Sequence, residues 1–368
     1  MVVPFLSLYL TKSLGFTLQD AAWIMSAFGA GSFFGSWLGG KLTDTIGFYK
    51  IMVFSLVVSG LMFIGLQFLT TFTEMALGVF VLVLFADMFR PAMFVALSAY
   101  SKPENKTRSV SLIRLAINLG FSAGPAIGGF IIVSMSYGGL FWVDGITCII
   151  AGLLLLNVLH PKKAKTLDNV VNENPKSAYK DGSYLIFLVA MVLFSICFLQ
   201  YFSTMPLYYK NVHFLSENNI GILLGLNGFL VFVLEMPVVK AFESGRHKQT
   251  TLIILGALFT AFSFLVLNLS SWVGILIIGM LLMSVGEILA FPFSNAFALK
   301  RAKRGNQGEY MALYSIAFAI AQTFGHNTSM QFVDRFGFEF TWYASTGLML
   351  MSVLILIILR TRMATNPD

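Results

Sequence analysis

Long apolar runs alternate with short polar or charged breaks along most of the chain. They predict helices over residues 19–40, 50–71, 75–100, 109–133, 138–159, 182–208, 218–241, 250–269, 272–299, 308–332 and 338–360. Most of these runs reach the roughly 20 residues that a helix needs to cross the hydrocarbon core of a bilayer. Residues 1–10 are also apolar, but they lack the basic region and the cleavage site of a signal peptide. We interpret them as the end of a truncated first span and expect roughly 10 to 15 residues of that span to precede Met1.

The longest polar stretch, residues 160–181, divides the predicted spans into two sets of six. Its Pro, Asn and Lys content and its lack of apolar periodicity predict a linker and not a domain. We therefore expect an N-terminal helix bundle over 1–159, a linker over 160–181, a C-terminal bundle over 182–361 and a tail over 362–368. Two such bundles with pseudo-two-fold symmetry, an all-α polytopic fold, are expected of an alternating-access transporter whose substrate binds between them.

The composition supports a membrane protein and explains the net charge of +7. Of 368 residues, 57% are hydrophobic and only 11% are charged, whereas about a quarter are charged in a soluble domain, so a water-soluble globule is excluded. The Lys and Arg residues fall almost entirely in alternate loops, with these exceptions: Lys12, Lys210, Arg335, Arg90 and Arg114. The positive-inside rule places those loops and the C-terminus in the cytoplasm, and the cytoplasmic (inner) membrane is the expected location. The charge is thus topological and does not indicate nucleic-acid binding.

Residues 40–50 form the loop between the second and third predicted spans. They resemble a loop signature of the major facilitator superfamily, G-x-L-x-D-R-x-G-R followed by Arg or Lys, at Gly40, Leu42, Asp44, Gly47 and Lys50. Thr45 and Phe48 stand where that family has arginines, which implies a weaker ionic contact. Glycines permit a tight turn, and Asp44 can cap or pair with a neighbouring helix end. The resemblance implies a cytoplasmic gating loop formed by Gly40, Asp44, Gly47 and Lys50; an ordinary solvated turn is the alternative.

A second motif lies in the fifth predicted span. The segment matches G-x-x-x-G-P-x-x-G-G, a signature of the antiporters of that superfamily, at Gly120, Gly124, Pro125, Gly128 and Gly129. Gly120, Gly124 and Gly128 share one helix face, which predicts a close approach to a partner helix, and Pro125 predicts a bend. Simple helix packing is the alternative. The chain most resembles the twelve-helix proton-coupled drug antiporters, or multidrug exporters, and this resemblance implies their fold and activity.

Ionisable residues inside predicted spans are candidates for proton coupling, because a charge in the membrane is costly. Asp87 and Arg90 lie three residues apart in the fourth span, so they can pair on one helix face. Drug exporters of the superfamily carry a fourth-span arginine implicated in proton coupling, although the context R-x-x-x-G is not kept here. Glu287 lies midway along the tenth span and is the leading proton site. Glu235, nearer the cytoplasmic end of the eighth span, is a second candidate, and structural pairing is the alternative for each.

The substrate cavity is predicted from the aromatic content. The 37 Phe and 18 Met residues offer an adaptable wall for varied lipophilic molecules, with Tyr201 and Tyr208 near the seventh span as candidate cavity residues. His326, in the outer part of the eleventh span, is a further candidate because histidine titrates near neutral pH. A hydrogen-bonded helix contact is the alternative for this histidine.

Other classes of function lack sequence support. Cys148 and Cys197 lie in apolar runs, no His, Asp or Glu cluster has metal-ligand spacing, and no G-x-x-x-x-G-K motif followed by Ser or Thr indicates ATP binding. We therefore expect no enzyme activity, no metal and no cofactor, and a proton gradient as the energy source. The predicted function is proton-coupled export of small lipophilic or cationic compounds by a monomer in the lipid bilayer. A proton-coupled importer of a peptide or sugar and a non-transporting receptor or scaffold are the alternatives.

Overall fold

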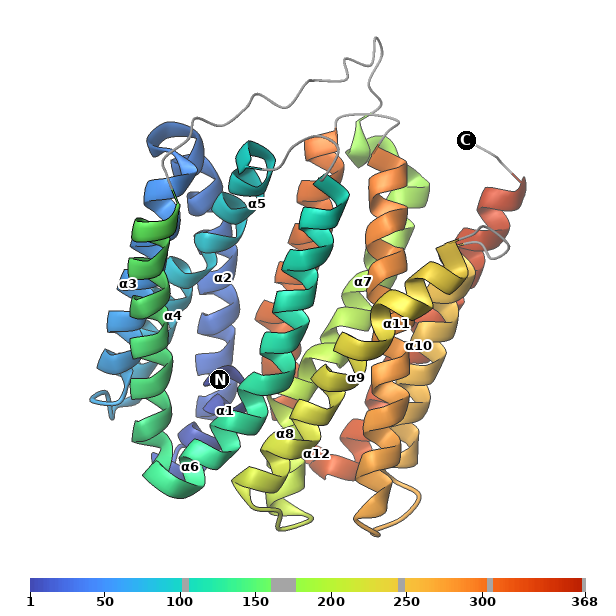
Figure 1. Cartoon of the computed structure of the whole chain (residues 1–368). Helices are drawn as coiled ribbons and strands as arrows, with labels where there is room; N and C mark the ends of the chain where they lie inside the picture. The colour runs from blue at the N-terminus through green and yellow to red at the C-terminus, as the bar shows by residue number, and fades with distance from the viewer. Residues whose placement is uncertain (101–105, 160–176, 244–248, 303–306, 366–368) are drawn as a thin grey trace.

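The structure is a computed structural model, and it describes residues 1–100, 106–159, 177–243, 249–302 and 307–365. All regular secondary structure in these ranges is helical (Figure 1). The N half comprises α1 (Val3–Leu8), the π-helical turn η1 (Tyr9–Ser13), α2 (Leu18–Ile46), α3 (Phe48–Leu66), α4 (Phe72–Asp87), α5 (Phe89–Tyr100) and α6 (Lys106–Val158). The C half comprises α7 (Gly182–Leu199), α8 (Thr204–Asn211), α9 (Glu217–Glu243), α10 (Gln249–Val266), α11 (Gly274–Ala302) and α12 (Gln307–Thr365), with short 3-10 turns η3 (Ala178–Lys180) and η4 (Gln200–Phe202).

Two of the helices, α6 and α12, each contain two membrane-length arms. The backbone turns at Ser136 in α6, with φ 65°, and at Gly337 in α12, with φ 78°. A positive φ interrupts the helical path, and glycine adopts it without a steric cost at the second position. Each helix therefore crosses the bundle and returns, as the separate predicted spans on either side of these residues require.

Two predicted spans are each divided between two helices, and the prediction of one continuous helix was wrong for the span over 182–208. The span over 75–100 is interrupted at Met88 between α4 and α5, and the span over 182–208 is interrupted by η4 and Ser203. Pro91 and Pro206 follow these breaks by three residues. A proline ring clashes with the carbonyl of the residue four positions earlier and lacks a donor for it, which explains both interruptions.

The ends of the helices define two ends of the molecule. At the linker end, α2 and α6 end at Ile46 and Val158 and α7 begins at Gly182; at the far end, α2 begins at Leu18 (Figure 1). Within the described chain, eight helices are long and apolar enough to cross a membrane, and large apolar side chains such as Trp37 and Leu154 are exposed on the outer surface. Such a surface is expected of helices that face lipid. Most of the predicted linker, residues 160–176, lies outside the described residues.

The two halves contact each other along a seam between α6 and α9. A Cβ atom at Gly221 or Gly228 of α9 would clash with the backbone of α6 at Pro125 or Ser122, and one at Gly129 of α6 would clash with the start of α9. Glycine is therefore required on both helices for this approach. The seam lies in the far half of the molecule because α9 begins at the far end. A second close contact between the halves joins α2 to α12, where Gly29 lies against the backbone of Thr323.

Candidate functional site

A cavity of about 650 Å³ lies between the two halves. Helices α1, α2, α4, α5 and α6 line it from the N half, and α7, α9, α11 and α12 line it from the C half together with η4. Its aromatic wall consists of Phe28, Phe121, Phe198, Tyr201, Phe202, Phe291, Tyr314 and Phe318, and its polar side chains are Asp87, Arg90, Asn118, Asn227, Glu235, Glu287, Asn295, Gln322 and His326. The volume and the mixture of an apolar wall with a few polar groups suit a small-molecule site.

Glu287 of α11 lies in this cavity, as its prediction as the leading proton site requires. Its side chain is half-buried, and Oε2 accepts a hydrogen bond of 3.3 Å from Asn227 Nδ2 of α9. Asn227 Nδ2 also donates to Ser284 Oγ at 2.8 Å. No lysine or arginine forms an ion pair with Glu287 in the described part of the chain, so few neighbouring groups stabilise its ionised form.

Glu235 of α9, the second candidate, lies in the same cavity but is buried and firmly bonded. Its Oε2 accepts a hydrogen bond of 2.8 Å from Asn118 Nδ2 of α6, which belongs to the other half. The contact lies on the linker side of the glycine seam, because Asn118 precedes Ser122 on α6 and Glu235 follows Gly228 on α9. Glu235 therefore links the two halves beside the cavity.

The predicted pairing of Asp87 with Arg90 is corrected by the structure, although both side chains line the cavity. Asp87 accepts a hydrogen bond from Ser32 Oγ of α2, and no ion pair joins it to Arg90 among the residues that the structure describes. Asp87 ends α4 and Arg90 lies in the first turn of α5, and the bond to Ser32 holds the Asp87 carboxylate toward α2. Arg90 is exposed to the cavity and presents a cation there.

His326 and Tyr201 line the cavity, whereas Tyr208 does not. His326 is buried, its Nδ1 lies 2.9 Å from Ser203 Oγ, and its ring packs edge-on against Phe28 of the N half. Tyr201 donates to the carbonyl of Gly279 at 3.3 Å. The interruption before α8 turns Tyr208 away toward Trp342 of α12, so its prediction as a cavity residue was wrong.

The predicted antiporter motif faces in two directions. Gly120, Gly124 and Pro125 line the cavity, and Gly128 lies against Phe5 of α1. The close approach predicted for the face of Gly120, Gly124 and Gly128 occurs instead on the neighbouring face, where Pro125 and Gly129 meet α9. The partner glycines were not singled out in the sequence, although Gly221, Gly225 and Gly228 recur at helical spacing and could have indicated a second small-residue face.

The predicted gating loop lies at the linker end. Gly47, with φ 97°, joins α2 directly to α3, and this positive φ explains why glycine occupies the position. Gly40 lies in the last turns of α2 with open space around it, and Lys50 is exposed in the first turn of α3. The side chain of Asp44 lies outside the described residues, so its role in gating stays a prediction.

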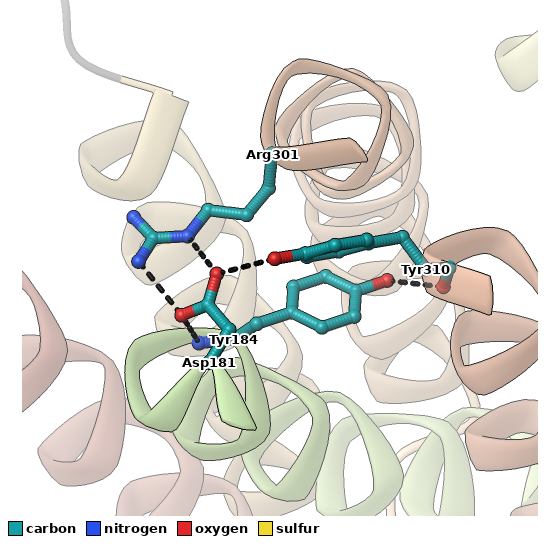
Figure 2. A network of polar contacts seen from close by, with 4 residues as sticks. All are labelled: Asp181, Tyr184, Arg301 and Tyr310. Carbon is teal, nitrogen blue, oxygen red and sulfur yellow. Dashed lines mark hydrogen bonds and ion pairs between the residues drawn. The ribbon is translucent and has the colours of Figure 1, made fainter. Parts of the chain in front are cut away.

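A polar cluster at the linker end of the C half was not predicted. Here Asp181 Oδ2 accepts from Arg301 Nε at 2.6 Å and from the Tyr310 hydroxyl at 2.9 Å, and Oδ1 accepts from Arg301 Nη2 at 2.7 Å and from the Tyr184 amide at 3.0 Å (Figure 2). Figure 2 also shows the Tyr184 hydroxyl donating to the carbonyl of Tyr310, at 2.6 Å. We call Asp181, Tyr184, Arg301 and Tyr310 the Asp181 cluster.

The Asp181 cluster is built to keep its carboxylate ionised. Burial raises the pKa of Asp181, but the hydrogen bonds from Arg301, Tyr184 and Tyr310 outweigh it and lower the pKa below its ordinary value. The cluster joins the start of α7 to the end of α11 and the start of α12. It lies apart from the cavity and fixes the linker end of the C half.

Together these features define a class of protein. Helical spans in two halves that enclose a polar cavity at their interface are the arrangement of a membrane transporter. A family model described as the Major Facilitator Superfamily matches residues 1–326, and the chain belongs to this family. The predicted family and the all-α membrane fold are thereby confirmed, and the family comprises transporters and not enzymes. In the described chain, no group of three His, Cys, Asp or Glu residues could hold a metal ion.

Several relatives and solved structures are similar to this chain. It is 26% identical over 322 residues to the uncharacterised MFS-type transporter YqjV of Bacillus subtilis, covering 84% of this chain and 77% of that protein. It is 22% identical over 375 residues to a Na(+), Li(+), K(+)/H(+) antiporter of Planococcus maritimus, covering 93% and 87%. A 27% identical match over 197 residues covers 52% of this chain and 49% of the quinolone resistance protein NorA of Staphylococcus aureus. The fold matches a peptide transporter POT in complex with sulfate at a TM-score of 0.81 and 16% identity, covering 98% and 90%.

Proposed function

We propose that this transporter exports small lipophilic or cationic compounds in exchange for protons. The observation that carries the proposal is the position of Glu287, a half-buried carboxylate with one amide donor in the cavity between the halves. A carboxyl group in such a place can be neutralised by a proton or by a cationic substrate, and competition between the two couples their movements. The relatives named as an antiporter and as a quinolone resistance protein support the same reading.

The chemistry of the cavity favours a substrate that is both aromatic or apolar and positively charged. The cavity lining holds three carboxylates, of Asp87, Glu235 and Glu287, and one arginine, Arg90. Eight aromatic side chains complete the wall, and an aromatic face attracts a cation through its quadrupole. A lipophilic cation therefore satisfies the excess of carboxylates and the apolar wall together.

The proposed transport cycle alternates the accessibility of this cavity. Because α6 and α9 are in contact in the far half of the molecule, we take the far end as closed and the linker end as the side from which the cavity is reached. We place the linker end and the C-terminus in the cytoplasm, and the protein in the cytoplasmic membrane, because most Lys and Arg residues fall at that end. Substrate enters from the cytoplasm when Glu287 is ionised, and protonation of Glu287 from the other side releases it after the halves rock.

The test uses everted membrane vesicles with an acidic lumen and ethidium as a lipophilic cation probe. Addition of ethidium should make the lumen more alkaline in vesicles that contain the wild-type chain, because each cation that enters expels a proton. Vesicles with Glu287→Gln should take up no ethidium against its gradient and should show no change in lumenal pH. Wild-type uptake without any proton movement, or an unchanged response of Glu287→Gln, would overturn the proposal.

A proton-coupled importer is the second candidate, favoured by the shared fold with peptide transporters. It differs from the exporter in the direction of proton movement relative to solute. In right-side-out vesicles, an importer acidifies the lumen when a dipeptide is added outside, whereas the proposed exporter does not respond. A scaffold moves neither solute nor protons, so it responds neither to the dipeptide here nor to ethidium in everted vesicles, whereas each transporter responds in one of the two assays.

A further inference from the structure

The polar contacts around Glu287 extend through two further side chains. Ser284 Oγ donates to the carbonyl of Met280 at 2.9 Å, so its hydroxyl hydrogen is engaged within α11. The same oxygen accepts from Asn227 Nδ2 at 2.8 Å. The second hydrogen on Asn227 Nδ2 is directed to Glu287 Oε2 at 3.3 Å. Asn227 therefore donates to both Ser284 and Glu287, and Ser284 donates its own hydrogen to the backbone, so every donor and acceptor in the group has one assigned role.

This assignment of donors and acceptors decides which form of Glu287 is favoured. An amide nitrogen can donate a hydrogen bond but cannot accept one. Because the Ser284 hydroxyl hydrogen is already used, Ser284 fixes the nitrogen of Asn227, and not its oxygen, on the side of Glu287. A donor stabilises an ionised carboxylate more than a neutral carboxyl group. An amide with the reverse orientation would instead accept from the protonated form.

We infer that Asn227 is a positioning residue for the proton site, held in its orientation by Ser284, and that it sets the pH range over which Glu287 exchanges its proton. The inference rests on the proposed function, in which Glu287 is that site. Asn227 lies on α9 and Glu287 on α11, so the contact also fixes the direction in which the carboxylate faces the cavity. The polar contact acts through Glu287 and needs no contact between Asn227 and the transported molecule.

Other titratable or charged groups face the same cavity and belong in the test. They are Tyr201 on η4, Glu235 on α9, Tyr314 and His326 on α12, and Asp87 and Arg90 across the cavity in the N half. The described helix α10, which packs against α11, contributes no titratable side chain. Each of these groups is unchanged when Asn227 or Ser284 is replaced, so a shift in the pH profile of those variants reports on the Glu287 contact.

The experiment measures ethidium-driven proton efflux from everted vesicles across a range of lumenal and external pH. Asn227→Ala removes the donor, and the midpoint of the pH profile should move about one pH unit to the alkaline side, since a hydrogen bond to a charged group has about that effect. Ser284→Ala leaves Asn227 in place but frees its orientation, and should shift the midpoint in the same direction by a smaller amount. Asn295→Ala is the matched control, because this amide lines the same cavity on α11 without a hydrogen bond to Glu287 within the described residues.

The outcomes separate the inference from the proposed function. If Asn227→Ala lowers the rate at every pH and leaves the midpoint where Asn295→Ala leaves it, Asn227 has only a structural or substrate-binding role and the inference is wrong. If Ser284→Ala shifts the midpoint to the acid side, the assigned orientation of the Asn227 amide is wrong. If Glu287→Gln keeps the wild-type pH profile, the proposed proton site fails first, and the inference falls with it.

Discussion

Two carboxylates of the C half, Asp181 and Glu287, have opposite surroundings. Asp181 receives four hydrogen bonds, including two from Arg301, and its pKa is held low. In the described chain, the Glu287 carboxylate receives one hydrogen bond, of 3.3 Å, from an uncharged amide. A carboxylate with its lone pairs engaged stays ionised and joins helices, whereas one with few donors can change its protonation state. The number and charge of the donors thus distinguish a structural acid from a candidate functional one.

The largest effect expected from this contrast is on transport by Glu287→Gln. The amide keeps the size of the side chain but cannot exchange a proton, so proton-coupled ethidium movement should fall to the level of vesicles without the transporter. Thermal unfolding of the purified protein in detergent should be nearly unchanged, because Glu287 has one weak contact to lose. A marked loss of stability without a loss of coupling would reverse the roles of the two acids.

Asp181→Ala should have the opposite profile, with a large effect on stability. It leaves the buried guanidinium of Arg301 without its partner, and breaking such a buried pair costs about 3–5 kcal/mol. The melting temperature in detergent measures this loss. The double variant Asp181→Ala with Arg301→Met should recover part of it, because no uncompensated charge then remains. Equal melting temperatures for wild type and Asp181→Ala would contradict a structural role for the cluster.

The stability that Asp181 provides should depend on pH only in the acid range. Asp181 precedes the membrane-spanning segment that begins at Gly182, and its folded-state pKa lies below the unfolded value of about 3.9. Its contribution is therefore fully present above about pH 4 and is lost as the pH falls through the folded-state pKa. The difference in melting temperature between wild type and Asp181→Asn should stay constant from neutral pH down to about pH 5 and shrink below about pH 4.

A smaller effect is expected from one hydroxyl of the cluster. Tyr310→Phe removes the hydrogen bond of 2.9 Å to Asp181 and leaves the pair with Arg301, so about 1 kcal/mol of stability should be lost. Tyr343→Phe, at an exposed tyrosine of α12, is the matched control and should change the melting temperature little. A loss as large as that of Asp181→Ala would mean that the hydroxyl, and not the arginine, holds the cluster together.

The smallest effect is expected at the pair of Lys210 and Glu217, near the far end. Lys210 Nζ and Glu217 Oε1 lie 2.9 Å apart, but the lysine side chain is 29% exposed and water screens the pair. Lys210→Ala should therefore cost less than about 1 kcal/mol, and part of that loss should disappear in high salt. A salt-independent loss of stability as large as that of Asp181→Ala would show that exposure does not explain the difference between the Lys210–Glu217 and Arg301–Asp181 pairs.

Most of the fold could be predicted from the sequence, whereas much of the site could not. The spans, the turns near Ser136 and Gly337 and the family follow from apolar runs, glycines and motif spacing. The positions of Glu287 and Glu235 in the cavity also follow, because a carboxylate in an apolar span has few other acceptable places. The direction of Tyr208, by contrast, depends on the interruption before α8, and apolar periodicity does not show it.

The class of this protein follows from its sequence, because the bilayer requires long apolar helices whose number, spacing and motifs are local properties of the chain. Which polar groups meet depends on how the helices pack. Asn227 reaches Glu287 from another helix, and Asp181 meets an arginine 120 positions later in the chain. Such contacts depend on the rotation and separation of packed helices, which side chains from several segments of the chain set together. A span can be recognised from its own residues, but a binding site requires the relative placement of several.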